Sequence, residues 1–305
     1  MIVSVAVVAY NAEKTLPLLL NDLREQDYPH EKIEILLIDS MSEDGTRRVM
    51  ADFKERTEGF YDILLLENPG KIIPRGHNVA LEHYRGDALV RVDAHVKIPA
   101  DFISLSVKGL LSGEDVCGGI VESVTDQEGN LAQTLLIAEN SVFCGGAAGF
   151  RRLAEKDYVN TLAFALYRRE VFDTLGGFVN HTIFNEDMIY ASKAVNHGWK
   201  IAYAPDAQVV HSHNYTAWQQ FTRNFDLGVS HAQFPEVFAA VPAEGEGMRL
   251  VADTAKYLLR HHPLLLWRLF VHSAAKLIGY RLGKLYEKLP AKMVRVCSMQ
   301  EHYWK

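Results

Sequence analysis

Hydrophobic runs alternate with amphipathic segments through the first third of the chain. Four short runs have the apolar and β-branched composition of buried strands, and each ends at polar residues. Between them, apolar side chains recur at helical spacing, as at Leu16, Leu19 and Leu23. This alternation predicts an α/β fold with a mostly parallel central sheet and helices on both faces. The predicted strands are 2–9, 33–38, 63–66 and 88–92, and the predicted helices are 15–26, 46–56 and one that carries Arg75 and Asn78.

The pattern becomes mixed after residue 95. The glycine-rich stretch 144–149 is expected to be a flexible loop. From Trp218 onward the sequence is mostly helical and is interrupted by prolines. The predicted elements of the middle part are strands at 116–121, 164–167, 201–203 and 209–210 and a helix at 187–197.

The predicted strand 88–92 ends at Asp93, and His95 follows two residues later. Ligands of open α/β sheets bind at the carboxyl edge of the strands. Asp and His two residues apart in an extended turn point the same way, so both can face one divalent cation. Such an ion takes one or two protein ligands and fills its other positions with water or phosphate oxygens. The alternative is a turn-capping Asp beside a surface His.

Polar residues also follow the second and third predicted strands. Asp39 and Asp44 bracket the exit of the second strand, where a carboxylate can accept a hydrogen bond from a ribose hydroxyl or a ring N–H. Helix capping is the alternative for both. Lys71 and Arg75 can meet phosphate charge, although each alone is an ordinary surface base. No glycine-rich dinucleotide or P-loop motif occurs in the sequence.

The triplet Asn185-Glu186-Asp187 precedes a predicted helix. Adjacent carboxylates repel each other, and the helix dipole at this end favours their ionised forms. An ionised Asp within reach of a hydroxyl is a competent general base. The alternative is a simple pair of N-terminal capping residues.

Two histidines, His211 and His213, follow the last short predicted strand. One of them can complete a metal shell with Asp93 and His95, or contact a diphosphate. The alternative is a structural role. Two histidines and a carboxylate usually suggest zinc or iron. A diphosphate in the site favours Mn²⁺ or Mg²⁺ instead.

Taken in order, these motifs resemble those of the family 2 glycosyltransferases, which have the GT-A fold. Within the family they look most like the branch with bacterial exopolysaccharide (succinoglycan-type) glucosyltransferases. The resemblance implies a GT-A catalytic domain over residues 1–230, with a nucleotide-sugar half at about 1–95 and an acceptor half at about 96–230, and a basic helical extension over 231–305. The segments that carry it are 7–13, 38–46, 68–78, 91–95, 165–178 and 185–187.

The resemblance also implies a nucleotide-binding group. Tyr10, Glu13 and Asp39 match residues that hold the base and ribose. Arg75 or Asn78 is expected to join them.

The same resemblance implies a catalytic and a metal-binding group. Asp93 and His95 occupy the family's DxD position, which contacts ribose and binds the metal on the donor diphosphate. His95 stands where the family usually has a second carboxylate. His211 falls where many members place a histidine near metal or diphosphate. Asp187 matches the catalytic base, and Glu186 matches its acidic neighbour.

The implied reaction is an inverting transfer of one sugar from a nucleotide-diphosphate sugar, expected to be a UDP-sugar, with Mn²⁺ or Mg²⁺ as cofactor. The acceptor is a glycan or lipid-linked glycan of cell-surface polysaccharide synthesis. The QxxRW signature of processive synthases is incomplete, since Asn224 follows Arg223, and this favours single transfers. The alternatives are a nucleotide-sugar nucleotidyltransferase and a non-catalytic glycan- or nucleotide-binding protein.

Charge and cysteine content bear on location. The formal charge is −6, but residues 249–305 hold 11 Lys and Arg against 3 Asp and Glu, whereas the rest of the chain holds 21 against 35. This basic tail predicts contact with an anionic membrane surface; packing on the catalytic domain or a homodimer contact are the alternatives. Three cysteines without a CxxC pair and no recognisable signal peptide predict a cytoplasmic protein, peripheral on the inner face of the plasma membrane. We expect no nucleic-acid partner.

Overall fold

The computed structural model describes most of the 305 residues, and the chain divides into two compact units that are treated separately here. The first unit comprises residues 1–122, 152–181 and 186–211, and the second comprises 123–151, 182–185 and 212–305. The glycine-rich stretch 144–149 and His213 lie outside the described residues. The described residues are 1–118, 121–124, 157–158, 164–203, 209–212, 215–238, 251–252, 254–256 and 258–304.

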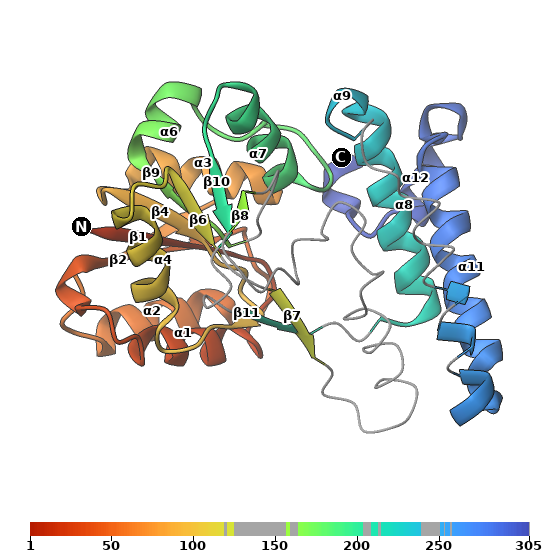
Figure 1. Cartoon of the computed structure of the whole chain (residues 1–305), viewed down its shortest axis with the longest axis horizontal. Coiled ribbons are helices and arrows are strands. Elements are labelled where there is room, and N and C mark those ends of the chain that lie inside the picture. Colours follow the sequence, from red (N-terminus) through yellow and green to blue (C-terminus); the bar gives the residue numbers. More distant parts are fainter. Residues whose placement is uncertain are drawn as a thin grey trace. The chain divides into compact units, whose positions relative to one another are not determined.

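The first unit is built on an eight-stranded sheet with the order β3-β2-β1-β4-β9-β6-β10-β8 (Figure 1). The strands β3, β2, β1 and β4 run parallel to one another, and β6 runs parallel to β10. In contrast, β9 runs antiparallel to both β4 and β6, and β8 runs antiparallel to β10. The strand bounds are β1 Val3–Ala9, β2 Ile33–Asp39, β3 Asp62–Glu67, β4 Ala88–Arg91, β6 Val116–Gly118, β8 Asp157–Tyr158, β9 Leu166–Arg168 and β10 Ile201–Tyr203.

A second, three-stranded sheet has the order β5-β11-β7. Its strands are β5 Val96–Lys97, β11 Val209–Ser212 and β7 Val121–Val124. The pairing of β11 with β5 is antiparallel.

Helices cover both faces of the main sheet (Figure 1). Val3, Val5 and Val7 of β1 belong to one apolar core with residues of α1, α2 and α4. Since side chains alternate along a strand, Val8 faces the other layer, where Gly76 of α3 lies against it. The helices of this unit are η1 His30–Lys32, α1 Leu16–Arg24, α2 Thr46–Arg56, α3 Ile73–His83, α4 Phe102–Leu111, α6 Arg169–Leu175 and α7 Glu186–Asn196.

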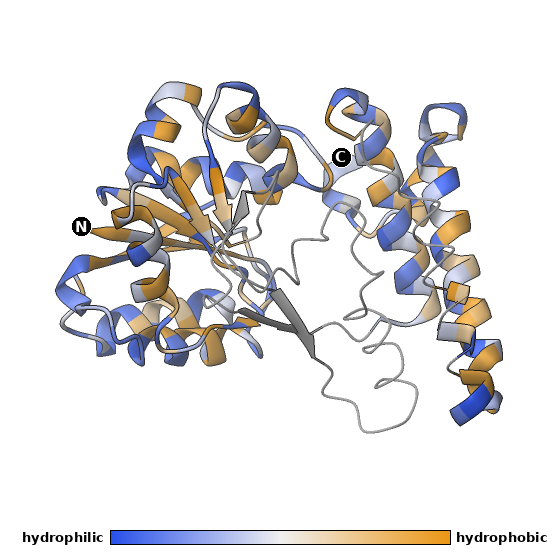
Figure 2. Ribbon diagram, in the orientation of Figure 1, coloured by the Kyte–Doolittle hydropathy of each residue, from blue (hydrophilic) through white to orange (hydrophobic). Residues whose placement is uncertain are grey.

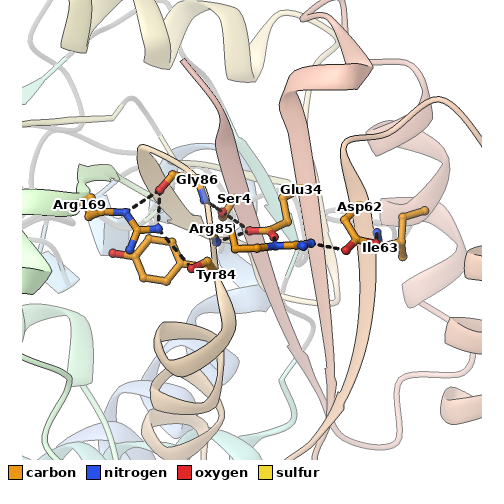
Figure 3. A network of polar contacts seen from close by, with 8 residues as sticks. All are labelled: Ser4, Glu34, Asp62, Ile63, Tyr84, Arg85, Gly86 and Arg169. Carbon is orange, nitrogen blue, oxygen red and sulfur yellow. Dashed lines mark hydrogen bonds and ion pairs between the residues drawn. The ribbon is translucent and has the colours of Figure 1, made fainter.

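A polar network joins the amino ends of the central strands (Figure 3). Glu34 is fully buried, and its carboxylate accepts hydrogen bonds from the Ser4 hydroxyl (2.5 Å) and from the Arg85 backbone N–H and Nε (2.8 and 2.9 Å). Ser4 and Glu34 are register partners of β1 and β2, so they share one face of the sheet. Arg85 also pairs with Asp62 at the start of β3. The network therefore fastens the edge of the sheet opposite to the candidate site.

The second unit is mostly helical in its described part. The long helices α8 (Ala217–Gln233) and α11 (Leu266–Gly283) pack against each other at very close range. Gly228, Gly279 and Gly283 make this approach possible, because a Cβ at Gly283 would lie 2.0 Å from the Phe225 carbonyl oxygen. The other elements are α9 Pro235–Phe238, η3 Pro263–Leu265, η4 Tyr286–Lys288, α12 Ala291–Cys297 and η5 Glu301–Trp304.

The predicted fold class is confirmed: a mostly parallel sheet carries helices on both faces, and helices follow it in the sequence. The sequence-based prediction did not include α4, α6, β5 or β8, nor the reversed direction of β9. The domain boundary predicted at residue 230 falls inside α8. The division of the catalytic domain into a nucleotide half and an acceptor half stays a prediction.

Candidate active site

The carboxyl ends of the parallel strands bring most of the predicted site residues to one edge of the sheet. Ala9, Asp39 and Glu67 are register partners at the ends of β1, β2 and β3. The backbone N–H of Val92, just past β4, donates to the Ala6 carbonyl (2.9 Å), so the chain leading to Asp93 runs along the same edge. Residues that follow these strands in sequence therefore share one edge in space.

At the end of β4, Arg91 forms an ion-paired cluster with the start of α7. Its side chain is 6% exposed. Its Nη1 lies 2.8 Å from the Glu186 carboxylate, and its Nη2 lies 3.8 Å from that of Asp187. The neighbouring Val90 belongs to the core with α1 and α2, so Arg91 faces the opposite layer of the sheet. Because side chains alternate between the two faces along β4, the Arg91 guanidinium points toward the acidic residues at the start of α7.

The charges of this cluster perturb one another. Burial raises the pKa of Glu186 to about 7, with Asp187 adding to the rise and Arg91 opposing it. Burial also raises the pKa of Asp93, while His95 and Arg91 lower it and Asp187 raises it. Three carboxylates therefore share one guanidinium and one imidazole. A cation bound at this edge would offset the repulsion among these carboxylates.

The donor set suits a hard divalent ion that takes few protein ligands. Asp93 supplies a carboxylate and His95 a nearby imidazole, and such an ion completes its shell with water and phosphate oxygens. Among the side chains that the structure describes, no group of three metal-ligating residues is arranged to enclose an ion. The side chain of His211 lies outside that set. Its backbone, in β11, is the register partner of Val96, next to His95.

The nucleotide-side candidates lie after β1 and β2. Asp39 is buried, and its carboxylate accepts a hydrogen bond from the Ser42 N–H (3.1 Å). The Glu13 carboxylate accepts one from the Gly45 N–H (3.1 Å), so it joins the two strand-exit loops. The ring of Tyr10 is exposed, and the Lys71 ammonium lies 6.0 Å from its centre. An exposed ring beside a buried carboxylate is an arrangement that can receive a base and a ribose.

Two of the predicted nucleotide-binding residues, Arg75 and Asn78, hold a loop at 178–180. The Asn78 amide donates to the Phe178 carbonyl (3.0 Å) and accepts from the Phe178 N–H (2.8 Å). Its Nδ2 also donates to the Asn180 side chain (2.9 Å), and Arg75 Nε donates to the Asn180 carbonyl (3.3 Å). The Phe178 ring in turn lies 5.5 Å from the Arg91 guanidinium. These two side chains therefore order the loop that lines the Arg91 cluster.

Sequence reasoning did not single out Arg91 or His77. The sequence signal for Arg91 is an arginine at the end of an otherwise apolar strand, because a buried charge needs an oppositely charged partner. His77 of α3 is buried with its ring 5.3 Å from that of Phe178, and burial holds its pKa well below the usual range. Its Nδ1 has no hydrogen-bond partner among the described residues. No local signal distinguishes it from an ordinary helix histidine.

Comparison with known proteins places the chain in a family. The model of Glycosyl transferase family 2 matches residues 4–176. The chain therefore belongs to this family.

Two curated relatives have closely related activities. The O-antigen chain rhamnosyltransferase WbaN of Salmonella anatum is 41% identical over 175 residues, which cover 56% of this chain and 52% of that protein. The O-antigen chain rhamnosyltransferase RfbN of Salmonella typhimurium is 42% identical over 160 residues, which cover 52% and 50%. The chain thus spans about half the length of the curated relatives it matches. These relatives support the family but not the predicted succinoglycan-type glucosyltransferase branch, which is corrected accordingly.

The fold resembles that of a solved mannosyltransferase. The mannosyltransferase PcManGT from Pyrobaculum calidifontis, in complex with GDP-Man and Mn²⁺, superimposes with a TM-score of 0.65 at 21% identity. The match covers 94% of this chain and 88% of that one. The fold is therefore of the GT-A type.

Proposed function

We propose that this protein transfers a single rhamnosyl residue, with inversion, from a nucleotide-diphosphate sugar to a growing O-antigen or related cell-surface glycan. The observation that carries the proposal is the cluster of Asp93, Glu186 and Asp187 around Arg91, at the carboxyl edge of the sheet of a family 2 glycosyltransferase. The rhamnosyl group is favoured by relatives that are 41% and 42% identical. A lipid-linked glycan is the proposed form of the acceptor.

The nucleotide is left to experiment. The structural neighbour was solved with GDP-Man, whereas the curated relatives transfer rhamnose, so the shared fold does not fix the donor. The UDP-sugar expected from the sequence stays a prediction. Tyr10, Asp39 and Asp93 are the proposed contacts for base and ribose, with Glu13 bracing the loops beside them.

Asp187 is the proposed general base. Glu186 is committed to Arg91 at 2.8 Å, whereas Asp187 lies 3.8 Å from the guanidinium and its side chain is the more exposed of the two, 23% against 14%. It lies in the first turn of α7. Asp187 can therefore take the proton from an acceptor hydroxyl as its oxygen attacks the anomeric carbon, opposite to the departing nucleotide diphosphate.

Asp93 and His95 are the residues proposed to hold Mn²⁺ or Mg²⁺, with His211 as a third candidate. When bound, the ion would neutralise the diphosphate as it leaves. Glu186 and Arg91 then act as positioning residues, because they fix the start of α7 relative to β4. Arg75 and Asn78 are proposed to contribute through the loop at 178–180 rather than through the nucleotide.

The test is release of nucleoside diphosphate from UDP-, GDP- and dTDP-linked rhamnose, with and without a chelator. We expect turnover with one donor, loss of turnover on chelation, and a fall in kcat of at least ~100-fold in Asp187→Asn. Donor binding by calorimetry is expected to survive this substitution. The matched control is Asp173→Asn, which changes an exposed acid on α6.

Two results would contradict the proposal. Unchanged kcat in Asp187→Asn would remove that residue as the base. Formation of a nucleotide-sugar with release of pyrophosphate, from a nucleoside triphosphate and a sugar phosphate, would indicate a nucleotidyltransferase instead.

A further inference from the structure

A row of large apolar side chains is exposed along α11. Phe270 is 74% exposed, Trp267 is 62% and Ile278 is 52%, and Val271 and Leu277 lie between them. Leu264, in the preceding η3 turn, is exposed as well. We define these six residues as the α11 stripe. Large apolar side chains that cluster in this way are unusual on a surface that faces only water.

The stripe lies on the side of the helix that α8 does not cover. Leu269, Gly279 and Gly283 are the buried residues of α11, and the two glycines face the backbone of α8. Stripe residues recur three and four positions apart, which places them on one face of the helix. The hydrophobic colouring of α11 in Figure 2 runs along the length of the helix. The apolar face is therefore separate from the face that packs in the helix pair.

The surroundings of the stripe are basic. No Asp or Glu occurs between Asp253 and Glu287, and Arg268 and Arg281 of α11 and Lys284 just after it are exposed. Apolar anchors with flanking Arg and Lys are the composition of a helix that lies in the interface of an anionic bilayer. Among the described helices, none is long and apolar enough to cross a membrane.

We propose that the α11 stripe docks on an anionic lipid bilayer, with the helix axis parallel to the surface. Charge decides between this partner and a second copy of the chain. Two copies that met through this face would bring their Arg and Lys side chains together without intervening carboxylates, whereas anionic headgroups supply the opposite charge. Trp267, with an apolar ring and a donor N–H, suits the headgroup level.

This inference rests on the surface of the second unit and not on the proposed activity. Membrane binding would hold the enzyme at the surface that carries the proposed lipid-linked acceptor. A failure of the proposed function would leave it standing.

The test uses the full chain and vesicles of phosphatidylcholine, alone or mixed with phosphatidylglycerol. We expect flotation with the mixed vesicles, weaker flotation with phosphatidylcholine alone, and partial release at high salt. The triple variant Trp267→Ser/Phe270→Ser/Ile278→Ser is expected to bind at least ~10-fold more weakly, because three large apolar groups no longer leave water. The control is Leu18→Ser/Leu111→Ser, which changes two exposed leucines of the first unit.

A second readout is the tryptophan emission, which is expected to shift to the blue on addition of mixed vesicles in wild type but not in Trp267→Phe. Calorimetric binding of the donor nucleotide to the triple variant is expected to be unchanged, which separates this test from that of the activity. Equal flotation of wild type and triple variant would overturn the proposal. So would a wild-type dimer that the triple variant converts to monomer without any vesicle binding, since the stripe would then serve a second copy.

Discussion

A single buried guanidinium lies among the carboxylates of the candidate site. Arg91 contacts Glu186 directly and approaches Asp187, and both partners come from a segment some ninety residues further along the chain. Removing one partner of a buried ion pair leaves the other charge without compensation, which costs more than the pair gains by forming. Arg91 is therefore expected to control both the stability of this edge and the position of the proposed base.

Arg91→Met should lower the free energy of unfolding by ~3 kcal/mol, because Glu186 loses its partner beside two other carboxylates. Urea unfolding measures this change, and kcat is expected to fall with it. Adding Glu186→Gln to Arg91→Met should recover part of the stability but not of kcat. Losses that simply add in the double variant would mean that the pair is not coupled.

Asp226 of α8 is a buried carboxyl group outside the candidate site. Its Oδ2 accepts a hydrogen bond from the Met299 N–H (2.9 Å), and burial raises its pKa to about 7. The folded chain therefore keeps a proton that the unfolded chain has released above about pH 4. The free energy of unfolding contributed by this group thus falls as the pH rises from about 4 to about 7.

Asp226→Asn should remove that pH dependence, because the amide oxygen can still accept from Met299 and carries no charge. We expect the variant to be more stable than wild type at pH 8 by ~1–3 kcal/mol and no more stable at pH 4. Chemical denaturation at the two pH values measures the difference, with Asp173→Asn as the exposed control. A variant destabilised equally at both values would show that the carboxyl does not titrate as described.

At the scale of elements, close approach rather than hydrophobic bulk fixes the α8 and α11 pair. A Cβ at Gly279 would lie 2.3 Å from the Phe221 carbonyl oxygen, and one at Gly283 2.0 Å from that of Phe225. Both obstacles are backbone atoms, which cannot move aside as a flexible side chain can. Any side chain at these positions forces the helices apart.

Gly283→Ala should therefore destabilise the second unit by ~2 kcal/mol or more, even though alanine favours helix formation by about 1 kcal/mol over glycine. Thermal unfolding followed by circular dichroism measures the effect. Ile278→Ala, one position before Gly279 on the exposed stripe, is the matched control and should change stability little. Tolerance of alanine at position 283 would mean that the helices are further apart than described.

At the scale of the whole molecule, the segment that matches the family model does not include all of the proposed catalytic residues. The family model matches residues 4–176 and ends before Glu186 and Asp187. The tertiary structure brings these two residues next to β4. Strand β9 lies between β4 and β6 in the sheet, and α7, which follows β9 in the sequence, begins beside Arg91. The basic second unit adds the α11 stripe. The two units thus carry separate proposed tasks, chemistry in the first and surface attachment in the second.

The sequence by itself determined the strands β1 to β4, the helices between them and the family. Strands such as β2 are recognisable because burial on both faces of a parallel sheet demands a nearly continuous apolar run, and α2 has the bounds that its pattern predicts. The strand-end positions of Asp39 and Asp93 follow from the same pattern. These features are local, so composition and spacing along the chain are enough to find them.

Only the tertiary structure decided which distant groups meet. The Glu34 that interrupts the apolar run of β2 is explained by Ser4 and Arg85, which the register and a loop bring to it. The Asn78 amide donates to the Phe178 carbonyl, a hundred residues away, and no local pattern indicates this contact. The antiparallel direction of β9 and the pairing of Arg91 with Glu186 were likewise decided only by the tertiary structure. Each depends on contacts between segments far apart in sequence, whose partners no local pattern specifies.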